Sequence, residues 1–192
     1  PKATRLTYRV RTAGRMDVLT WKKAMRHAAL YINGGGSLIQ DVTSRRSLWF
    51  YLHNIQAAHK AGCKVQMYGC GIGPVLREQH RQLAARVLNA SVDVITLREP
   101  DSLKELQSMG VTKPEILLTA DPALTLPAAN SDEIDSVLLR SGIPPRGNYL
   151  CFALRNWKGF EEKAPLFSQA AQYAYETYGL TPVFAAVEKH LD

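Results

Sequence analysis

The same pattern occurs twice in the first half of the chain, as ALYINGGGSLIQD at residues 29–41 and as KVQMYGCGIGP at residues 64–74. Each stretch begins with a short apolar run and continues into a cluster of glycines. Runs that are apolar on nearly every residue are typical of strands covered on both faces, as in a parallel sheet. We therefore predict strands at Ala29–Asn33 and Lys64–Gly69, each followed by a glycine turn that leads into a helix.

Strands and helices alternate along the rest of the chain as well. The same criteria predict strands at Leu6–Arg11, Val92–Leu97, Glu115–Thr119, Tyr149–Leu154 and Pro182–Val187. Between them apolar residues recur at helical spacing, as in Leu48, Tyr51, Leu52 and Ile55, and in Leu103, Leu106 and Met109, after which Gly110 ends the helix. This alternation predicts an α/β fold with a doubly wound, parallel, Rossmann-like sheet.

Prolines and glycines interrupt the alternation once, around a short helix predicted at Asp132–Leu139. Such a composition is typical of a linker between domains. We predict an N-terminal Rossmann-like domain at residues 1–127, a linker at 128–147 and a second Rossmann-like domain that begins at 148 and runs to 192. Because strand-like runs lie close to both ends of the chain, we expect a fragment, with the start of the first domain missing and the second domain truncated.

Basic residues are concentrated near the start of the chain. The net charge is +7, and residues 1–30 hold eight basic side chains against the single acid Asp17. Such a patch attracts nucleic acid, an anionic membrane surface or a phosphorylated substrate, and charge alone does not choose among them. A solvated basic face without a partner is an equally good interpretation.

Composition excludes several classes of protein. With 46% hydrophobic and 21% charged residues the chain is typical of globular domains. No apolar run approaches the ~18 residues of a membrane-spanning helix. The three cysteines, Cys63, Cys70 and Cys151, form no C-x-x-C pair, which argues against a disulfide framework and a zinc ribbon. These features favour a cytoplasmic protein.

The two glycine clusters are candidate anion-binding sites at the carboxyl edge of the predicted sheet. There, backbone N–H groups beside a helix N-terminus favour an anion, although a tight turn with positive φ would use glycine equally well. Neither cluster has the G-x-G-x-x-G or G-K-[ST] spacing, so neither a dinucleotide cofactor nor a P-loop is predicted. The candidate residues are Gly34, Gly35, Gly36 and Ser37 in the first cluster and Gly71 and Gly73 in the second.

Polar residues follow two further predicted strands. Arg98 and Glu99 come after Val92–Leu97, and Asp121 comes after Glu115–Thr119. Because the carboxyl ends of parallel strands share one edge, we expect these side chains to line one crevice, although each is also a normal helix cap or ion-pair residue. The histidines lack metal-ligand spacing and Ser37 lies outside a G-x-S-x-G motif, so neither a metal site nor a hydrolase triad is predicted.

Arg45 and Arg46 begin a predicted helix that carries Trp49, Phe50 and Tyr51. Basic and aromatic residues together are found in nucleic-acid-binding proteins. These aromatics fall largely on the face of the helix predicted to pack in the core, so no nucleic-acid partner is predicted.

GGGSLIQDVTSRRSL at residues 34–48 carries a resemblance to a known family. It resembles the polysaccharide pyruvyl transferases, particularly the bacterial cell-wall enzymes. YGCGIGP at 68–74, VDVITLRE at 92–99 and TADPA at 119–123 agree with the family in the same order. The resemblance runs through nearly the whole chain and weakens before Trp21 and between Pro127 and Tyr149. A Gly-rich first strand and loop and an Arg-Leu-His segment, both usual in the family, are not found in this sequence.

The resemblance implies a two-domain fold similar to the GT-B glycosyltransferases. It implies transfer of a pyruvyl group from phosphoenolpyruvate, the donor substrate, to a sugar as a cyclic ketal with release of phosphate, without a cofactor. The acceptor in bacterial relatives is typically part of a cell-wall precursor on a polyprenyl diphosphate at the inner face of the membrane, which the basic first residues would suit. As a fragment, the chain alone is expected to be inactive.

The resemblance and this chemistry together indicate site residues. Arg155 falls where such enzymes place an arginine facing the interdomain cleft, and its planar fork suits the donor. Asp41 is our candidate for proton transfer, with a helix-capping role equally good. We expect substrate contacts from Gly34, Gly35, Gly36, Ser37, Gln40, Arg45, Gly71, Gly73, Arg98, Asp121 and Arg155. A GT-B glycosyltransferase that uses a nucleotide sugar and a non-catalytic α/β binding domain are the alternatives.

Overall fold

The computed structural model describes residues 10, 12–14, 17–145, 147–155 and 159–186. The chain divides into two compact units, Pro1–Leu126 and Pro127–Asp192. The strand predicted at Leu6–Arg11 lies, apart from Val10, outside the described residues.

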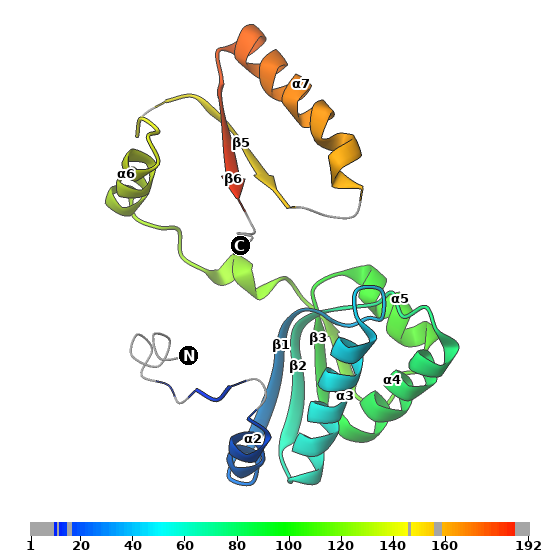
Figure 1. Ribbon diagram of the computed structural model, residues 1–192. Helices are drawn as coiled ribbons and strands as arrows, with labels where there is room; N and C mark the ends of the chain where they lie inside the picture. Colours follow the sequence, from blue (N-terminus) through cyan, green and yellow to red (C-terminus); the bar gives the residue numbers. More distant parts are fainter. Residues whose placement is uncertain (1–9, 11, 15–16, 146, 156–158, 187–192) are drawn as a thin grey trace. The chain divides into compact units, whose positions relative to one another are not determined.

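The first unit is built on a four-stranded parallel sheet in the order β1-β2-β3-β4 (Figure 1). Its strands are β1 (Leu30–Ile39), β2 (Lys64–Ile72), β3 (Val94–Leu97) and β4 (Glu115–Leu118). Val65, Met67 and Ile95 point into the core and are buried, as the apolar runs predicted. The α/β, parallel, Rossmann-like prediction is confirmed.

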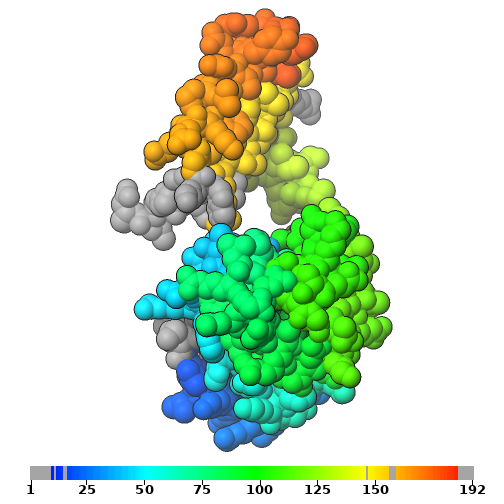
Figure 2. Space-filling model, turned by 90° about the vertical axis from the view of Figure 1, so that its right-hand side faces the viewer, coloured from blue at the N-terminus to red at the C-terminus, as the bar shows by residue number. Residues whose placement is uncertain are grey.

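Among the described residues of this unit the α-helices are α2 (Val18–Met25), α3 (Arg45–Lys60), α4 (Glu78–Ser91) and α5 (Pro100–Ser108). The strand order follows the chain, so right-handed crossovers place the connecting helices α3, α4 and α5 on the same face of the sheet. Their side chains form a continuous layer in the space-filling view (Figure 2, cyan to green). Among the described residues this sheet lacks the reversal of strand order that puts helices on both faces of a doubly wound sheet.

The helix boundaries follow from local sequence. Ser44 caps α3, its hydroxyl accepting a hydrogen bond from the Ser47 N–H, and Leu48 and Ile55 form the buried stripe predicted for this helix. The predicted end of α5 is also confirmed, because Gly110 follows it with a φ of 78°.

The second unit contains α6 (Ser131–Arg140), β5 (Tyr149–Leu154), α7 (Phe160–Tyr178) and β6 (Thr181–Ala186). The strands β5 and β6 pair in parallel, with Phe152 stacked on Phe184 at a ring-centroid distance of 4.9 Å. The last strand begins one residue before the predicted Pro182 and ends at Ala186. The described part of this unit is therefore one β-α-β crossover preceded by a short helix.

Candidate functional site

The first glycine cluster does not form the predicted turn. Gly34, Gly35, Gly36 and Ser37 all lie inside β1, with Gly34 opposite Tyr68 and Ser37 opposite Gly71 of β2. The turn starts only at Gln40. The prediction was wrong because β2 also runs on to Ile72 and gives this segment a strand partner, which sequence periodicity could not show. Only Gly36 has a positive φ, 85°, and a Cβ on Gly34 or Gly35 would meet nothing within 4 Å.

The second cluster also continues its strand, and here one glycine makes a close contact possible. Gly71 lies in β2, whereas Gly73, with a φ of 86°, follows the strand. A Cβ on Gly71 would lie 2.5 Å from Ser37 Oγ, 2.8 Å from Glu99 Oε1 and 3.4 Å from Arg98 Nη2. The absence of a side chain at residue 71 thus lets a hydroxyl, a carboxylate and a guanidinium meet at one point. We call Ser37, Gly71, Arg98, Glu99 and Asp121 the Gly71 cluster.

Arg98 is held in this cluster from two sides. Its Nη1 donates to Asp121 Oδ2 at 2.8 Å and its Nη2 donates to Ser37 Oγ at 3.5 Å. Asp121 also accepts a hydrogen bond from the Ala123 N–H, and this bond and the Arg98 guanidinium hold the pKa of the carboxyl below its usual value despite some desolvation. The guanidinium is therefore oriented before any ligand arrives.

Another glycine, Gly69, allows the loop after β4 to pack closely against β2. Gly69 has a φ of 58°, and a Cβ there would collide with the ring of Pro122, which begins the short 3-10 helix η1 (Pro122–Thr125). Asp121 directly precedes this proline. The contact explains how a residue beyond β4 reaches Arg98 at the end of β3.

Glu99 belongs to the cluster, as the predicted crevice implied, although we did not predict it to contact the substrate. Its Oε1 accepts a hydrogen bond from Ser102 Oγ at 3.0 Å. Ser102 is buried and its hydroxyl in turn accepts from the Ile72 N–H at 2.7 Å, which ties the start of α5 to the end of β2. The position of Glu99 beside Arg98, directly after a predicted strand, was the signal available in the sequence. That Glu99 lies close to Gly71 was not visible there.

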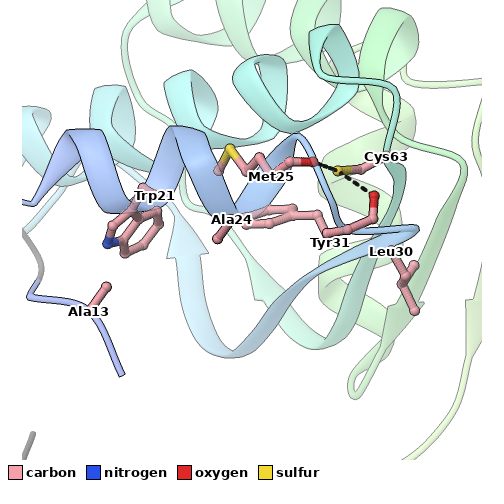
Figure 3. Close-up of a pocket in the computed structure, with 8 residues that line it drawn as sticks. Ala13, Trp21, Ala24, Met25, Leu30, Tyr31 and Cys63 are labelled. Atoms are coloured by element: carbon pink, nitrogen blue, oxygen red, sulfur yellow. Dashed lines mark hydrogen bonds between the residues drawn. The ribbon is translucent and has the colours of Figure 1, made fainter. Parts of the chain in front are cut away.

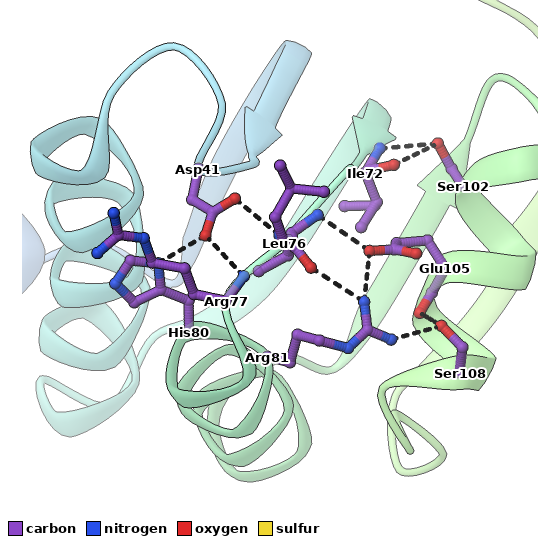
Figure 4. Close-up of polar contacts among 10 residues, drawn as sticks. Asp41, Ile72, Leu76, Arg77, His80, Arg81, Ser102, Glu105 and Ser108 are labelled. Carbon is purple, nitrogen blue, oxygen red and sulfur yellow. Dashed lines mark hydrogen bonds and ion pairs between the residues drawn. The ribbon is translucent and has the colours of Figure 1, made fainter.

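Asp41 lies in a different network (Figure 4). Its side chain is 1% exposed and accepts hydrogen bonds from the Leu76 N–H at 2.8 Å, the Arg77 N–H at 3.2 Å and His80 Nδ1 at 2.7 Å. Burial raises the pKa of the Asp41 carboxyl, but these hydrogen bonds outweigh that effect and hold the pKa below its usual value. Asp41 thus fastens the start of α4 to the end of β1, and its proton-transfer role stays a prediction.

Glu105 and Arg81 hold the other side of the loop between β2 and α4. Glu105 Oε1 accepts from the Val75 N–H at 3.0 Å and from Arg81 Nη1 at 2.9 Å, and Arg81 Nη2 donates to Ser108 Oγ at 2.7 Å (Figure 4). A Cβ on Gly73 would lie 2.7 Å from Glu105 Cγ, so this predicted site residue packs tightly against α5. Both networks brace the segment that follows Gly71.

Three further predicted site residues lie outside the Gly71 cluster. The Gln40 side chain accepts from the N–H groups of Val42 and Thr43 and so shapes the turn before α3. Arg45 is the exposed first residue of α3, and Arg155 follows β5 in the second unit with an exposed side chain. The structure therefore brings together Ser37, Gly71, Arg98 and Asp121 of the predicted set.

An apolar cavity of about 220 Å³ lies elsewhere, between α2 and the start of β1 (Figure 3). Trp21, Met25 and Tyr31 line it, and the Cys63 thiol donates to the carbonyl oxygens of Met25 and Ala28. Burial raises the pKa of Tyr31 to about 12, so its hydroxyl stays neutral. Among the described residues that line this cavity no side chain is charged, so they offer no cation to bind an anion.

The Gly71 cluster has the groups for such chemistry. It lies at the carboxyl edge of a parallel sheet, where ligands of α/β proteins bind. A guanidinium binds a carboxylate or phosphate, and a carboxyl group moves protons to and from bound hydroxyls. Among the described residues no group of three or more His, Cys, Asp or Glu side chains could hold a metal ion.

Comparison with known proteins identifies a family to which the sequence is similar. The family model described as polysaccharide pyruvyl transferase matches residues 3–192, and so spans both units of the chain. Neither a curated protein nor a solved structure gives a significant match.

Proposed function

This chain belongs to the polysaccharide pyruvyl transferase family, and from that premise we propose that it transfers a pyruvyl group from phosphoenolpyruvate to a sugar as a cyclic ketal. Phosphate is the leaving group. The observation that carries the proposal is the convergence of Ser37, Arg98 and Glu99 on Gly71.

Arg98 is proposed to bind the donor. Phosphoenolpyruvate carries a carboxylate and a phosphate ester on the same carbon, and a planar guanidinium is the side chain best suited to such groups. Asp121 holds one edge of the guanidinium at 2.8 Å, which leaves the other edge directed toward Ser37 and Gly71. Arg155 of the second unit is proposed as a second cation for the donor, in a two-domain arrangement similar to the GT-B glycosyltransferases.

Glu99 is proposed to carry the proton of the first addition. A proton moves from its carboxyl group to the methylene carbon of the donor, and the electron pair of the carbon–carbon double bond forms the new C–H bond. A sugar oxygen then bonds to the central carbon, and the proton of that hydroxyl returns to the Glu99 carboxylate. This residue touches the reacting atoms and regains its starting state within one addition.

The second addition closes the ketal. A neighbouring sugar hydroxyl bonds to the same carbon, the bond from that carbon to the phosphate oxygen breaks, and the phosphate leaves with the electron pair and the hydroxyl proton. No cofactor is required. We propose a cell-wall or exopolysaccharide precursor, carried on a polyprenyl diphosphate, as the acceptor, and the cytoplasm as the location of the reaction.

Ligand-induced thermal shifts test the donor. Phosphoenolpyruvate is expected to raise the melting temperature of the chain, because a ligand that binds the folded state stabilises it, whereas uridine diphosphate is expected to have no effect. The shift should disappear in Arg98→Gln and persist in Arg86→Gln, a matched loss of one exposed arginine on α4. Stabilisation by uridine diphosphate alone would instead favour a glycosyltransferase that uses a nucleotide sugar, and stabilisation by neither ligand would favour a binding domain of another kind.

A further inference from the structure

The exposed side chains of α2 and α3 form a basic surface outside the Gly71 cluster. We call it the α2–α3 surface and define it by Leu19, Lys22, Lys23 and Arg26 from α2 and its cap and by Arg45, Arg46 and Trp49 from α3. Neither helix contains an acidic residue, and Asp17, which precedes α2, accepts a hydrogen bond from the Thr20 N–H as the cap of that helix. Basic side chains therefore outnumber acidic ones on these two helices.

The two helices lie side by side. The rings of Trp21 and Phe50 meet edge to face at a centroid distance of 6.1 Å. Beside this contact a groove of about 140 Å³ is lined by Val18 and Lys22 from α2 and by His53 from α3, among others. The groove therefore connects the surfaces of the two helices, and Figure 1 shows α2 beside the lower end of β1.

Apolar side chains project from the same region. Leu19 is 82% exposed, Val18 53% and Trp49 54%. Leu19, Lys22, Lys23 and Arg26 are spaced i, i+3, i+4 and i+7, so one face of α2 combines an aliphatic side chain with three cations, opposite the buried Met25. Trp49 shares a face of α3 with Arg46 and with His53 of the groove, at spacings of three and four residues.

We propose that the α2–α3 surface docks onto an anionic membrane. Cations attract the headgroups of acidic lipids, while exposed leucine and tryptophan enter the boundary between headgroups and acyl chains. The aliphatic residues distinguish this partner from a nucleic acid, because bases stack on aromatic rings and not on leucine or valine. The contact is peripheral, since among the described residues no helix is long and apolar enough to cross a bilayer.

The sequence predicted a basic patch within residues 1–30 that could attract any of several anionic partners. The proposal places the basic surface on α2 and α3 and names one partner, an anionic membrane. Five of the eight basic residues counted in residues 1–30 lie outside the described part of the chain, and they are Lys2, Arg5, Arg9, Arg11 and Arg15. The surface instead rests on Lys22, Lys23 and Arg26, joined by Arg45 and Arg46 from the next helix. It does not depend on the proposed transfer reaction.

Co-sedimentation of the whole chain with vesicles tests it. Binding is expected to vesicles of phosphatidylcholine and phosphatidylglycerol in equal parts and not to vesicles of phosphatidylcholine alone. It should fall steeply between about 0.1 M and about 1 M NaCl, where the screening length shrinks from about 10 Å to about 3 Å. The double substitution Lys22→Gln with Lys23→Gln should weaken binding by about thirtyfold, because each basic residue near such a surface contributes about 1 kcal/mol.

The matched control removes the same charge from the opposite edge of the sheet. Lys104→Gln with Lys113→Gln changes exposed lysines of α5 and of the segment before β4 and should leave vesicle binding nearly unchanged. Trp49→Ser should reduce the binding that persists at high salt. The proposal fails if both double variants bind equally well, if phosphatidylcholine alone suffices, or if a single-stranded oligonucleotide competes with the vesicles and loses its own affinity in Trp49→Ser. Far-UV circular dichroism confirms that each variant is folded.

Discussion

In the first unit four parallel strands pack against α3, α4 and α5, and residues such as Leu48, Ile95 and Leu106 are completely buried. In the described part of the second unit β5 pairs with β6, and α7 packs against β6. Among the described residues of the second unit, the buried hydrophobic side chains are Ala171 and Ala174. The same strand–helix alternation thus produces a core in one unit and a thin layer in the other. A layer buries apolar side chains only when its neighbours cover them, and two strands with one helix supply few neighbours.

This difference explains where a rigid site can form. The Gly71 cluster rests on three strands, and the hydrogen bonds of Asp41 and Glu105 brace the segment behind it. Arg155 follows β5 of the second unit, where Tyr175, Tyr178 and Phe184 remain largely exposed. We therefore expect substitutions in the first unit to have the larger effects on stability.

The largest expected effect comes from core truncation. Leu106→Ala in the first unit removes a side chain that is 0% exposed and should lower the free energy of unfolding by about 2–5 kcal/mol. Leu166→Ala in the second unit changes a leucine that is 62% exposed and should have an effect within about 0.5 kcal/mol. Urea unfolding followed by circular dichroism measures both. Equal losses would mean that the second unit buries its apolar surface as well as the first.

Donor binding is the next comparison. Arg98→Lys keeps the charge but loses the planar fork, so affinity for phosphoenolpyruvate should fall by about 1.5–3 kcal/mol, or roughly tenfold to a hundredfold. Arg155→Lys is expected to produce a loss of the same order if both units hold the donor. Isothermal titration calorimetry measures each. Unchanged affinity in Arg155→Lys would restrict the donor site to the first unit, and unchanged affinity in Arg98→Lys would remove the Gly71 cluster from it.

Two glycines of adjacent strands test the cluster geometry. Gly71→Ala forces Ser37 and Glu99 to move and should cost about 1–3 kcal/mol of stability and abolish the thermal shift with phosphoenolpyruvate. Gly35→Ala places its methyl group in open space without a positive φ, so both stability and ligand response should be retained. Comparing melting temperatures with and without ligand separates the two. Equal behaviour of the variants would mean that Gly71 holds no special position.

We expect the smallest effect on stability from Asp41→Asn, and we expect this effect to depend on pH. Because the folded-state pKa of Asp41 lies below its usual value, the ionised carboxylate stabilises the fold at neutral pH, and this contribution is lost as pH falls through the folded pKa. Asp41→Asn should therefore cost about 1–2 kcal/mol at neutral pH, and the gap from the wild type should narrow in acid. Melting temperatures between about pH 7 and about pH 3 test this. A gap that stays constant would show that ionisation of Asp41 does not contribute.

Most elements of the fold could be predicted from local sequence. Apolar runs located β2 and β5 at their first residues, Lys64 and Tyr149, and the spacing of Leu48, Leu52 and Ile55 located α3. These signals are local, because alternation, helical period and glycine caps each depend on neighbours a few residues away. The polar residues after β3 and β4 were likewise predictable as an edge cluster, since parallel strands end on the same side.

Only the tertiary structure decided what the glycines do and which polar groups meet. The glycines of β1 and β2 remain in strands because each segment is the other's partner, and that pairing joins residues more than thirty positions apart, as in Gly34 and Tyr68. Ser37 and Glu99 both approach residue 71 closely only because it has no side chain. Asp41 accepts hydrogen bonds from Leu76, Arg77 and His80, which lie 35 or more positions further along the chain. The sequence by itself determined the strands, helices and family of this chain, whereas the composition of its site depended on contacts between distant segments, which packing creates and local periodicity does not encode.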